Sequence, residues 1–447
     1  MSEPLRQVHL AAHFPGVNNT TVWSDPRAES QIDFSSFEHF ARNAERGRFD
    51  FLFLAEGLRL REHLGQVHDL DVVGRPNTQV ILAALAAVTD HIGLVGTLSA
   101  TFNEPFELAR QLASLDHLSD GRAGWNVVTS SDAFHGANFR RGGFLDHADR
   151  YTRASEFVAL SKRLWDAWSD DAVVADAALG QFLSASAITP VVHSGPQFTV
   201  TATPTVPRSP QRYPVIVQAG DSPAGRDFGS GHAEVIFSLH SGFDDARQFY
   251  SDVKGRLGAL GRTENSLKIL PGITFVVGDT AADAEEKSRA IARAQITPQT
   301  AIAFLEQTWN RELQGWDPDG PLPTVDPVVD GPSISAGRVQ RGGNVLEKVA
   351  TWRARAEAEH LSIRELVLAV GQRPSFVGTP TFIADEINRY VQNRATDGFV
   401  VIGNTNPYGL DEFVDRVIPE LQQRGVYRTD YSEGATLRDT LGLPSVT

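Results

Sequence analysis

Cysteine is absent from this chain of 447 residues. Disulfides, zinc–thiolate sites, iron–sulfur clusters and a cysteine nucleophile are therefore excluded. The sequence also lacks an uninterrupted apolar run of about 18 residues, so we expect no transmembrane helix. The segment Met1–Arg6 has no basic stretch followed by an apolar stretch, as a signal peptide would. We therefore expect a cytoplasmic protein.

Basic residues are fewer than acidic ones, with 41 Lys and Arg against 55 Asp and Glu, which gives a net charge of −14. Nucleic acids and anionic membranes need a basic face, so neither is expected as a partner. No Gly-x-Gly-x-x-Gly follows the first predicted strand, which disfavours a dinucleotide-binding open sheet. No Gly-x-Ser-x-Gly is present either, which disfavours a serine hydrolase of the α/β type.

The chain does contain a repeated unit, a short apolar run followed by a loop and a helical segment. Strands are predicted at 7–13, 51–55, 91–97, 122–129, 213–218, 234–239, 269–277 and 398–402. Helices are predicted at 35–46, 78–89, 105–118, 148–168, 222–231, 244–260, after Thr280, and at 381–393 and 410–424. Continuously apolar strands alternating with helices indicate a parallel sheet covered on its outside. Eight such strands favour an α/β fold of the TIM (β/α)8 type, although an open doubly wound sheet has the same repeat.

Two stretches interrupt the repeat, and we interpret them as insertions into a single domain that spans residues 1–447. Residues 172–207 are rich in Ala, Thr, Pro and Val and predict a small hairpin around His193–Thr203. Residues 295–342 are rich in Gly and Pro. A loop of that length inside a compact domain is often an active-site lid, so the second insertion is a lid candidate. A polar tail is expected after residue 424.

In a TIM barrel the active site lies at the C-terminal ends of the strands. That rule selects His13, Glu56, Thr97 and the hydroxyls of Ser130 and Ser131 as candidates. After the fifth strand it selects the turn formed by Ala219, Gly220, Asp221 and Ser222. Free N–H groups at a glycine turn that begins a helix suit a phosphate. A plain turn with a serine cap has the same sequence.

Each of the other candidate site residues also allows a functional and a structural interpretation. Tyr151, at the start of the fourth helix, either donates a hydroxyl to that phosphate or begins an ordinary solvated helix. His13 is either a general acid/base or a structural histidine. Glu56, at a strand end in an apolar context, needs N–H groups or a ligand as its partner. The spacing of His63, His68 and the nearby aspartates fits no standard metal site, so no metal is expected.

Several segments with these residues resemble the bacterial-luciferase-like, flavin-dependent monooxygenases, in the branch of nitrilotriacetate, EDTA, dibenzothiophene-sulfone and long-chain alkane monooxygenases. The matching segments are Phe49–Glu56, Leu115–Arg122, Trp125–Ser130, His147–Tyr151, Ser209–Gly220 and Ile418–Gly425. The run Trp-Asn-Val-Val-Thr-Ser within Gly121–Ser130 is specific to that branch. The segments extend from about residue 49 to 425, so the resemblance covers most of the chain.

The resemblance implies a two-component system, in which a separate NAD(P)H:flavin reductase supplies reduced FMN and the oxygenase uses dioxygen through a flavin peroxide. The FMN contacts that it implies are Glu56, Thr97, Ser130, Ser131, Tyr151, Ala219, Gly220, Asp221 and Ser222. His13 is our catalytic candidate from its strand-end position. Alkane-branch relatives have His where this chain has Ser131, and a Cys near the first strand, so their catalytic assignments do not transfer.

The expected substrate is a small organic molecule of the amine polycarboxylate, thioether or organosulfur class. Arg59, Arg61 and His63 on the loop after the second strand would favour a carboxylate or sulfonate if they face the pocket, and would otherwise form a solvated loop. Two other functions stay open, a deazaflavin-dependent oxidoreductase on the same barrel and a non-catalytic flavin-binding paralogue. Family members form homodimers or homotetramers, so we expect one of these states.

Overall fold

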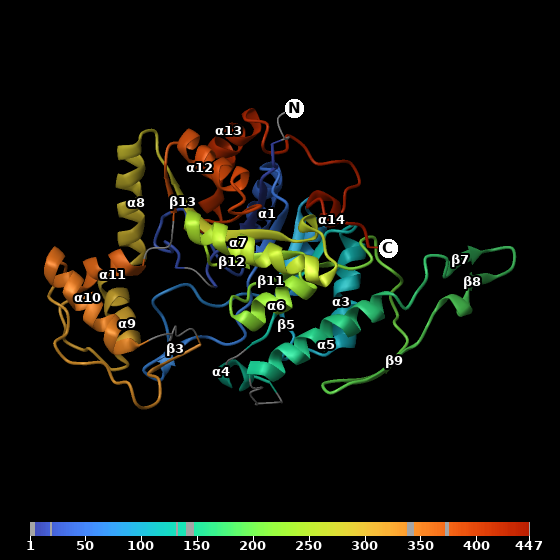
Figure 1. Cartoon of the computed structure of the whole chain (residues 1–447), viewed down its shortest axis with the longest axis horizontal. Coiled ribbons are helices and arrows are strands. Elements are labelled where there is room, and N and C mark those ends of the chain that lie inside the picture. The colour runs from blue at the N-terminus through green and yellow to red at the C-terminus, as the bar shows by residue number, and fades with distance from the viewer. Residues whose placement is uncertain are drawn as a thin grey trace.

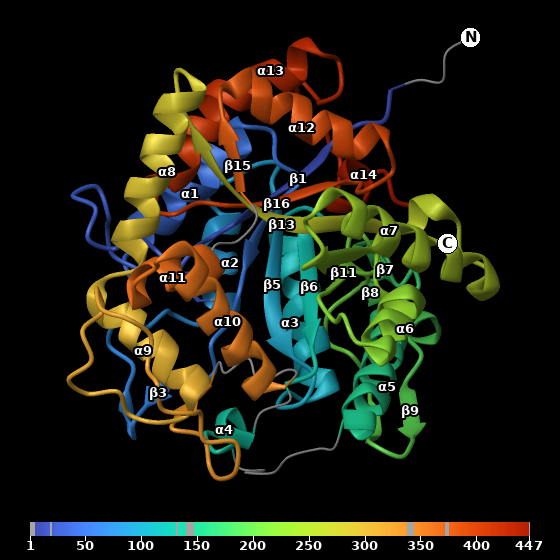
Figure 2. The same cartoon turned by 60° about the vertical axis from the view of Figure 1, so that its left-hand side comes forward.

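The computed structural model describes residues 5–17, 20–130, 133–139, 147–337, 344–371 and 375–446. Its centre is a closed barrel of eight parallel strands (Figures 1 and 2). The barrel strands are β1 (His9–His13), β2 (Phe51–Leu54), β5 (Gly93–Ser99), β6 (Ala123–Val128), β11 (Val215–Gln218), β12 (Val235–Ser238), β13 (Lys268–Val277) and β16 (Gly398–Ile402). They follow one another in this order around the barrel, and β16 pairs with β1 to close it. The expected TIM-barrel fold is confirmed.

Helices cover the outside of the barrel, as the continuously apolar strands require. They are α1 (Phe34–Arg46), α2 (Thr78–Ala86), α3 (Pro105–Leu118), α5 (His147–Trp165), α6 (Pro223–His232), α7 (Phe243–Leu257), α8 (Ala281–Gln295) and α12 (Pro380–Gln392). The last predicted helix begins with a π-helical turn, Phe413–Val417, and continues as α13 (Ile418–Gln423). Pro419 has no N–H to donate, which explains the irregular turn before it. In the described part of the chain no helix is both long and apolar enough to cross a membrane.

The expected polar tail after residue 424 instead fills the barrel interior from its N-terminal end. The tail contains the short helix α14 (Leu437–Thr440), which begins with a capping box between Thr436 and Asp439. Leu437, Leu441 and Leu443 are buried and pack among the inward-facing side chains of the barrel strands. Gly93 leaves the room for them, because a Cβ there would lie 2.5 Å from Leu437 Cδ1. The C-terminal tail is therefore the plug of the barrel.

The first insertion contains two hairpins. One joins β9 (Val191–Ser194) to β10 (Thr199–Ala202), which confirms the predicted hairpin. The other joins β7 (Val173–Asp176) to β8 (Gln181–Leu183) and extends away from the barrel (Figure 1). Leu179 and Phe182 on this arm are 75% and 67% exposed.

The second insertion and the residues after it form a small helical unit rather than a long loop. Its helices are α9 (Pro298–Trp309), α10 (Val345–Glu359) and α11 (Ile363–Gly371). They bury a separate apolar cluster that includes Trp309, Val349 and Leu366. These helices were not predicted, because Gly and Pro dominate the connecting segments. The chain then adds β15 (Ser375–Gly378), which pairs with β13 outside the barrel.

This helical unit is attached to the loop after β2. In that loop β3 (Glu62–His63) pairs with β4 (Gln66–Val67) and, on its other side, with β14 (Ser335–Ala336). The His63 imidazole bridges the two segments, with Nε2 2.6 Å from Glu306 Oε2 and Nδ1 2.7 Å from Ser335 Oγ. The insertion is thereby fixed over the end of the barrel at which β2 terminates.

Candidate active site at the C-terminal ends of the strands

The order of the strands brings most predicted site residues together. Strands β1, β2, β5, β6 and β11 are neighbours, so the segments that follow them form one continuous arc. His13, Glu56, Thr97, Ser130 and Gly220 lie along this arc at or just beyond the ends of successive strands. Ser131 lies outside the described residues. The arc is the part of the barrel at which the sequence predicts chemistry.

A buried polar layer lies between β5 and β6. Asn126 Nδ2 donates to Thr97 Oγ1 at 3.0 Å, and the hydroxyls of Ser99 and Ser130 are 2.8 Å apart. Asn126 is 3% exposed, and its Oδ1 finds no hydrogen-bond donor among the described residues. A buried amide oxygen without a donor is costly, so this atom fits a ligand N–H or O–H.

Asn126 was missed as a site residue, although a signal for it exists in the sequence. Alternate residues of a strand face opposite sides, and Trp125 is fully buried against the outer helices. Asn126 must then face the barrel interior near the C-terminal end of β6. A single amide side chain in an otherwise apolar barrel strand is the signal that could have identified Asn126.

The turn between β11 and α6 (residues 219–222, hereafter the Gly220 turn) is tightly closed. A Cβ on Gly220 would lie 2.2 Å from Gln218 Nε2 and 3.0 Å from the Tyr151 hydroxyl. Ser222 caps α6, and its Oγ accepts a hydrogen bond from the Gly225 N–H at 3.1 Å. Free N–H groups, the positive end of the helix dipole and a phenolic hydroxyl therefore meet at one glycine. This is the chemistry that holds a phosphate.

The carboxylate of Asp221, within the same turn, is already paired. It accepts hydrogen bonds from His240 Nε2 at 2.8 Å and from the Arg226 guanidinium at 3.1 Å. Burial opposes ionisation here, but these two partners hold the pKa of Asp221 below its usual value. Its negative charge is balanced locally, so it does not oppose an anion at the turn. Its expected contact with a cofactor would have to come from the backbone.

Glu56 lies two residues beyond β2 and has the ionisation behaviour of a functional group. Burial raises the pKa of its carboxyl from the usual 4.5 to about 7, and the hydrogen bond from the Thr78 backbone offsets this only in part. A large fraction of Glu56 is thus protonated near neutral pH. Such a carboxyl can donate a hydrogen bond or exchange a proton with a ligand.

His13 is the last residue of β1 and is 2% exposed. Its ring centroid is 5.4 Å from that of Phe53, the residue opposite it on β2. The Phe53 ring in turn lies 5.9 Å from that of Phe237 on β12. The imidazole therefore borders an aromatic wall inside the barrel, in a position that water reaches poorly.

Other residues of the sequence motifs maintain the fold instead. Arg122 is 4% exposed and donates to main-chain oxygens of Ala86, Thr89, Ile92 and Ser119. Asp116 accepts hydrogen bonds from the Gln211 side chain and backbone. Arg122 directly precedes β6, and Asp116 in α3 accepts a hydrogen bond from the Ala123 N–H at the start of that strand, so both lie away from the arc. Among the described residues no group of three or more His, Asp or Glu is placed to hold a metal ion.

Comparison with known proteins agrees with this architecture. Residues 15–397 match the family model for luciferase-like monooxygenases. The chain is 39% identical over 436 residues to nitrilotriacetate monooxygenase component A of Aminobacter aminovorans, covering 94% of this chain and 93% of the relative. It is 36% identical over 452 residues to dibenzothiophene-sulfone monooxygenase of Rhodococcus erythropolis (strain XP), covering 98% and 97%.

A solved structure, riboflavin lyase with modified FMN and the substrate riboflavin, superposes with a TM-score of 0.79 at 28% identity. The match covers 98% of this chain and 97% of that one. The family and branch expected from the sequence motifs are confirmed. The chain is a monooxygenase that belongs to the luciferase-like monooxygenase family.

Proposed function

We propose that this protein is the oxygenase of a two-component system that uses reduced FMN and dioxygen to oxidise a small organic substrate. The observation that carries the proposal is the Gly220 turn. It offers N–H groups and the Tyr151 hydroxyl around a glycine, with no room for a side chain. The solved relative with modified FMN supports a flavin as the occupant.

The residues of the arc fit a flavin mononucleotide. Gly220, Ser222 and Tyr151 would hold its phosphate, as the closed turn allows. Thr97, Asn126 and Ser130 would face its ring system, and Asn126 Oδ1 is the acceptor that lacks a donor among the described residues. Bound reduced FMN supplies the electrons that activate dioxygen, which is chemistry that no amino-acid side chain provides.

The protein's own part in the reaction is positioning, proton exchange and water exclusion. Glu56, with its pKa near 7, is suited to hold or release a proton at neutral pH. His13 is proposed as a second proton donor or hydrogen-bond donor beside the aromatic wall of Phe53 and Phe237. If His13→Ala binds flavin normally and turns over at an unchanged rate, this role is wrong.

The second insertion is proposed as the lid of the site. Its attachment through Glu306, His63 and Ser335 fixes it to the loop that follows Glu56. A cover at this position would keep water from the reduced flavin and oxygen, which otherwise lose electrons to hydrogen peroxide.

The proposed partners follow from the same chemistry. An NAD(P)H:flavin reductase would supply reduced FMN by diffusion or transient contact, which places both proteins in a compartment with NAD(P)H, the cytoplasm. We further propose a homodimer or homotetramer. The exposed Leu179 and Phe182 on the β7–β8 arm support self-association, because such apolar side chains are usually covered.

Oxygen uptake with FMN, NADH and a flavin reductase tests the proposal. Uptake that rises on addition of an amine polycarboxylate, a thioether or an organosulfur compound is the expected result. Flavin binding without substrate-dependent uptake would instead indicate a non-catalytic flavin-binding protein. Activity only with a deazaflavin coenzyme would indicate the oxidoreductase alternative.

A further inference from the structure

The loops after β1 and β2 enclose a pocket of about 320 Å³ that begins directly beyond Glu56. Its lining includes three guanidinium groups, those of Arg59, Arg61 and Arg75, against one carboxylate, that of Asp71. The whole protein carries a net charge of −14, so a pocket with this excess of cations is a local exception. The pocket is of the size that holds a small organic acid.

Arg75 is a buried cation without a counter-charge. Its guanidinium lies over the Phe14 ring at 4.9 Å and donates to main-chain oxygens of Ala55, at 3.1 Å, and of Pro15. In the described ranges no acidic side chain offsets its burial, and its buried Nε has no hydrogen-bond partner. Burial lowers the pKa of Arg75 to about 10, which leaves it charged at neutral pH. A buried unpaired charge is costly unless an anion joins it.

Arg61 adds a second cation to the lining of the pocket. It donates to the main-chain oxygen of Val17, and the described residues place no carboxylate within ion-pair distance of it. Burial lowers the pKa of Arg61, and Asp71 offsets this in part. Burial together with Arg61 and His63 lowers the pKa of His68, so this imidazole is neutral and can donate one hydrogen bond. The lining of this pocket thus presents hydrogen-bond donors and positive charge together.

Arg59, by contrast, is already engaged. Its guanidinium lies 3.9 Å from the Phe134 ring centroid and donates to Glu62 Oε1 at 2.9 Å. Any ligand must therefore be bound mainly by Arg61 and Arg75.

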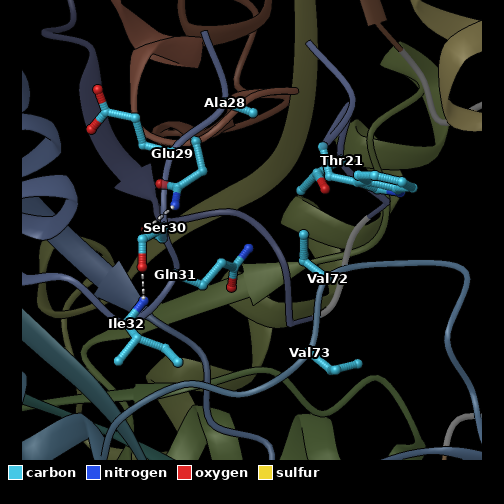
Figure 3. Close-up of a pocket in the computed structure, with 10 residues that line it drawn as sticks. Thr21, Ala28, Glu29, Ser30, Gln31, Ile32, Val72 and Val73 are labelled. Carbon is cyan, nitrogen blue, oxygen red and sulfur yellow. Dashed lines mark hydrogen bonds between the residues drawn. The ribbon is translucent and has the colours of Figure 1, made fainter. Parts of the chain in front are cut away.

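The neighbouring pocket shows that positive charge is not a general feature of this surface. Figure 3 shows that pocket, which is about 270 Å³ in volume and shares Val72 and Val73 with the pocket beside Glu56. Glu29 is the one charged residue among those that line it, and its polar lining residues include Thr21, Ser30, Gln31 and Asn406. The cationic character is confined to the pocket beside Glu56.

We propose that the pocket beside Glu56 is the substrate's anion subsite, in which Arg61 and Arg75 bind a carboxylate of the molecule to be oxidised. The proposal rests on the proposed function and narrows its substrate class to organic acids. A carboxylate supplies the counter-charge that Arg75 lacks and that Arg61 has only in part, through Asp71. Arg binds carboxylates with two parallel hydrogen bonds. Gly57, the residue after Glu56, lines the pocket, so an acid held there would lie next to Glu56 at the end of β2.

The test compares thiodiglycolate, a thioether with two carboxylates, with the uncharged thioether 2,2′-thiodiethanol. Calorimetry on the flavin-free protein should show that thiodiglycolate binds at least about tenfold more tightly, as expected for charge-assisted hydrogen bonds. Arg61→Gln and Arg75→Gln should each lose that preference, and Arg61→Lys should retain part of it. Arg110→Gln, an exposed arginine of α3 paired with Glu107, is the matched control and should bind like the native protein.

Equal binding of the two thioethers, or unchanged binding by a folded Arg61→Gln, would overturn the proposal. Displacement of thiodiglycolate by inorganic phosphate at similar concentration would also overturn it, because the pocket would then hold the cofactor's phosphate. Oxygen uptake separates this inference from the proposed function. Uptake stimulated equally by both thioethers refutes the subsite alone, whereas anion binding without any FMN-dependent uptake supports the subsite and refutes the function.

Discussion

Replacing Glu56 with glutamine should make the protein more stable at alkaline pH. Burial raises the pKa of this carboxyl from 4.5 to about 7. Between pH 4.5 and about pH 7 Glu56 therefore holds a proton in the folded protein but has lost it in the unfolded chain. The free energy of unfolding consequently falls as the pH rises through this range. At about 1.4 kcal/mol for each tenfold change in proton affinity, the full cost is about 3 kcal/mol above pH 7. Glutamine resembles the protonated carboxyl and avoids this cost.

Urea unfolding of the flavin-free native and Glu56→Gln proteins from pH 4 to pH 8.5 measures the effect. The two free energies of unfolding should be similar near pH 4 and diverge up to pH 7, with the variant the more stable. Glu107→Gln is the control, because that exposed carboxylate has its pKa lowered by Arg110 and should change stability by under about 0.5 kcal/mol. If the free energies of unfolding of the native and Glu56→Gln proteins differ by the same amount at every pH, the claim that burial raises the pKa of Glu56 is wrong.

Three further predictions test other parts of the structure. Tyr151→Phe should weaken the binding of FMN about tenfold but leave that of riboflavin unchanged, by fluorescence titration, because only the phosphate contact is lost. His63→Ala should raise the hydrogen peroxide released per reduced FMN, because the insertion loses its bridge to the loop after β2; an unchanged ratio would argue against a lid. Asp50→Asn should lower the free energy of unfolding by about 3 kcal/mol or more at pH 7, because it leaves the guanidinium of Arg428 without its carboxylate partner. Arg428 and His9 hold the pKa of Asp50 below 3.8 against its burial, so this contribution is present above pH 4 and is lost as the pH falls further.

The barrel was predictable because each of its strands is a short apolar run bounded by loops. Most ends fell within two residues of those observed, and β5 ends at Ser99 rather than Thr97. That shift matters, because it brings Ser99 into contact with Ser130. The positions of Glu56 and Gly220 at the rim followed from the barrel rule alone.

Features that depend on distant parts of the chain were not predictable. Leu437 of α14, and Leu441 and Leu443 after it, fill the barrel's N-terminal end, where Gly93 leaves space for Leu437. The helices α9, α10 and α11 are stable because they bury Trp309 and its neighbours against one another. Arg75 lies in a loop without a recognisable motif, and its burial without a counter-charge, which the sequence does not reveal, is what led us to propose it as a binding residue.

Anaerobic binding of reduced FMN and reduced riboflavin tests the central claim most directly. The claim is that the Gly220 turn holds the phosphate of the flavin. The native protein should bind reduced FMN at least about tenfold more tightly than reduced riboflavin. Gly220→Val should abolish this preference, whereas Gly231→Ala, in the helix α6 that follows the turn and with open space around it, should preserve it. Equal binding of the two flavins by the native protein, or an unchanged preference in Gly220→Val, would contradict the account.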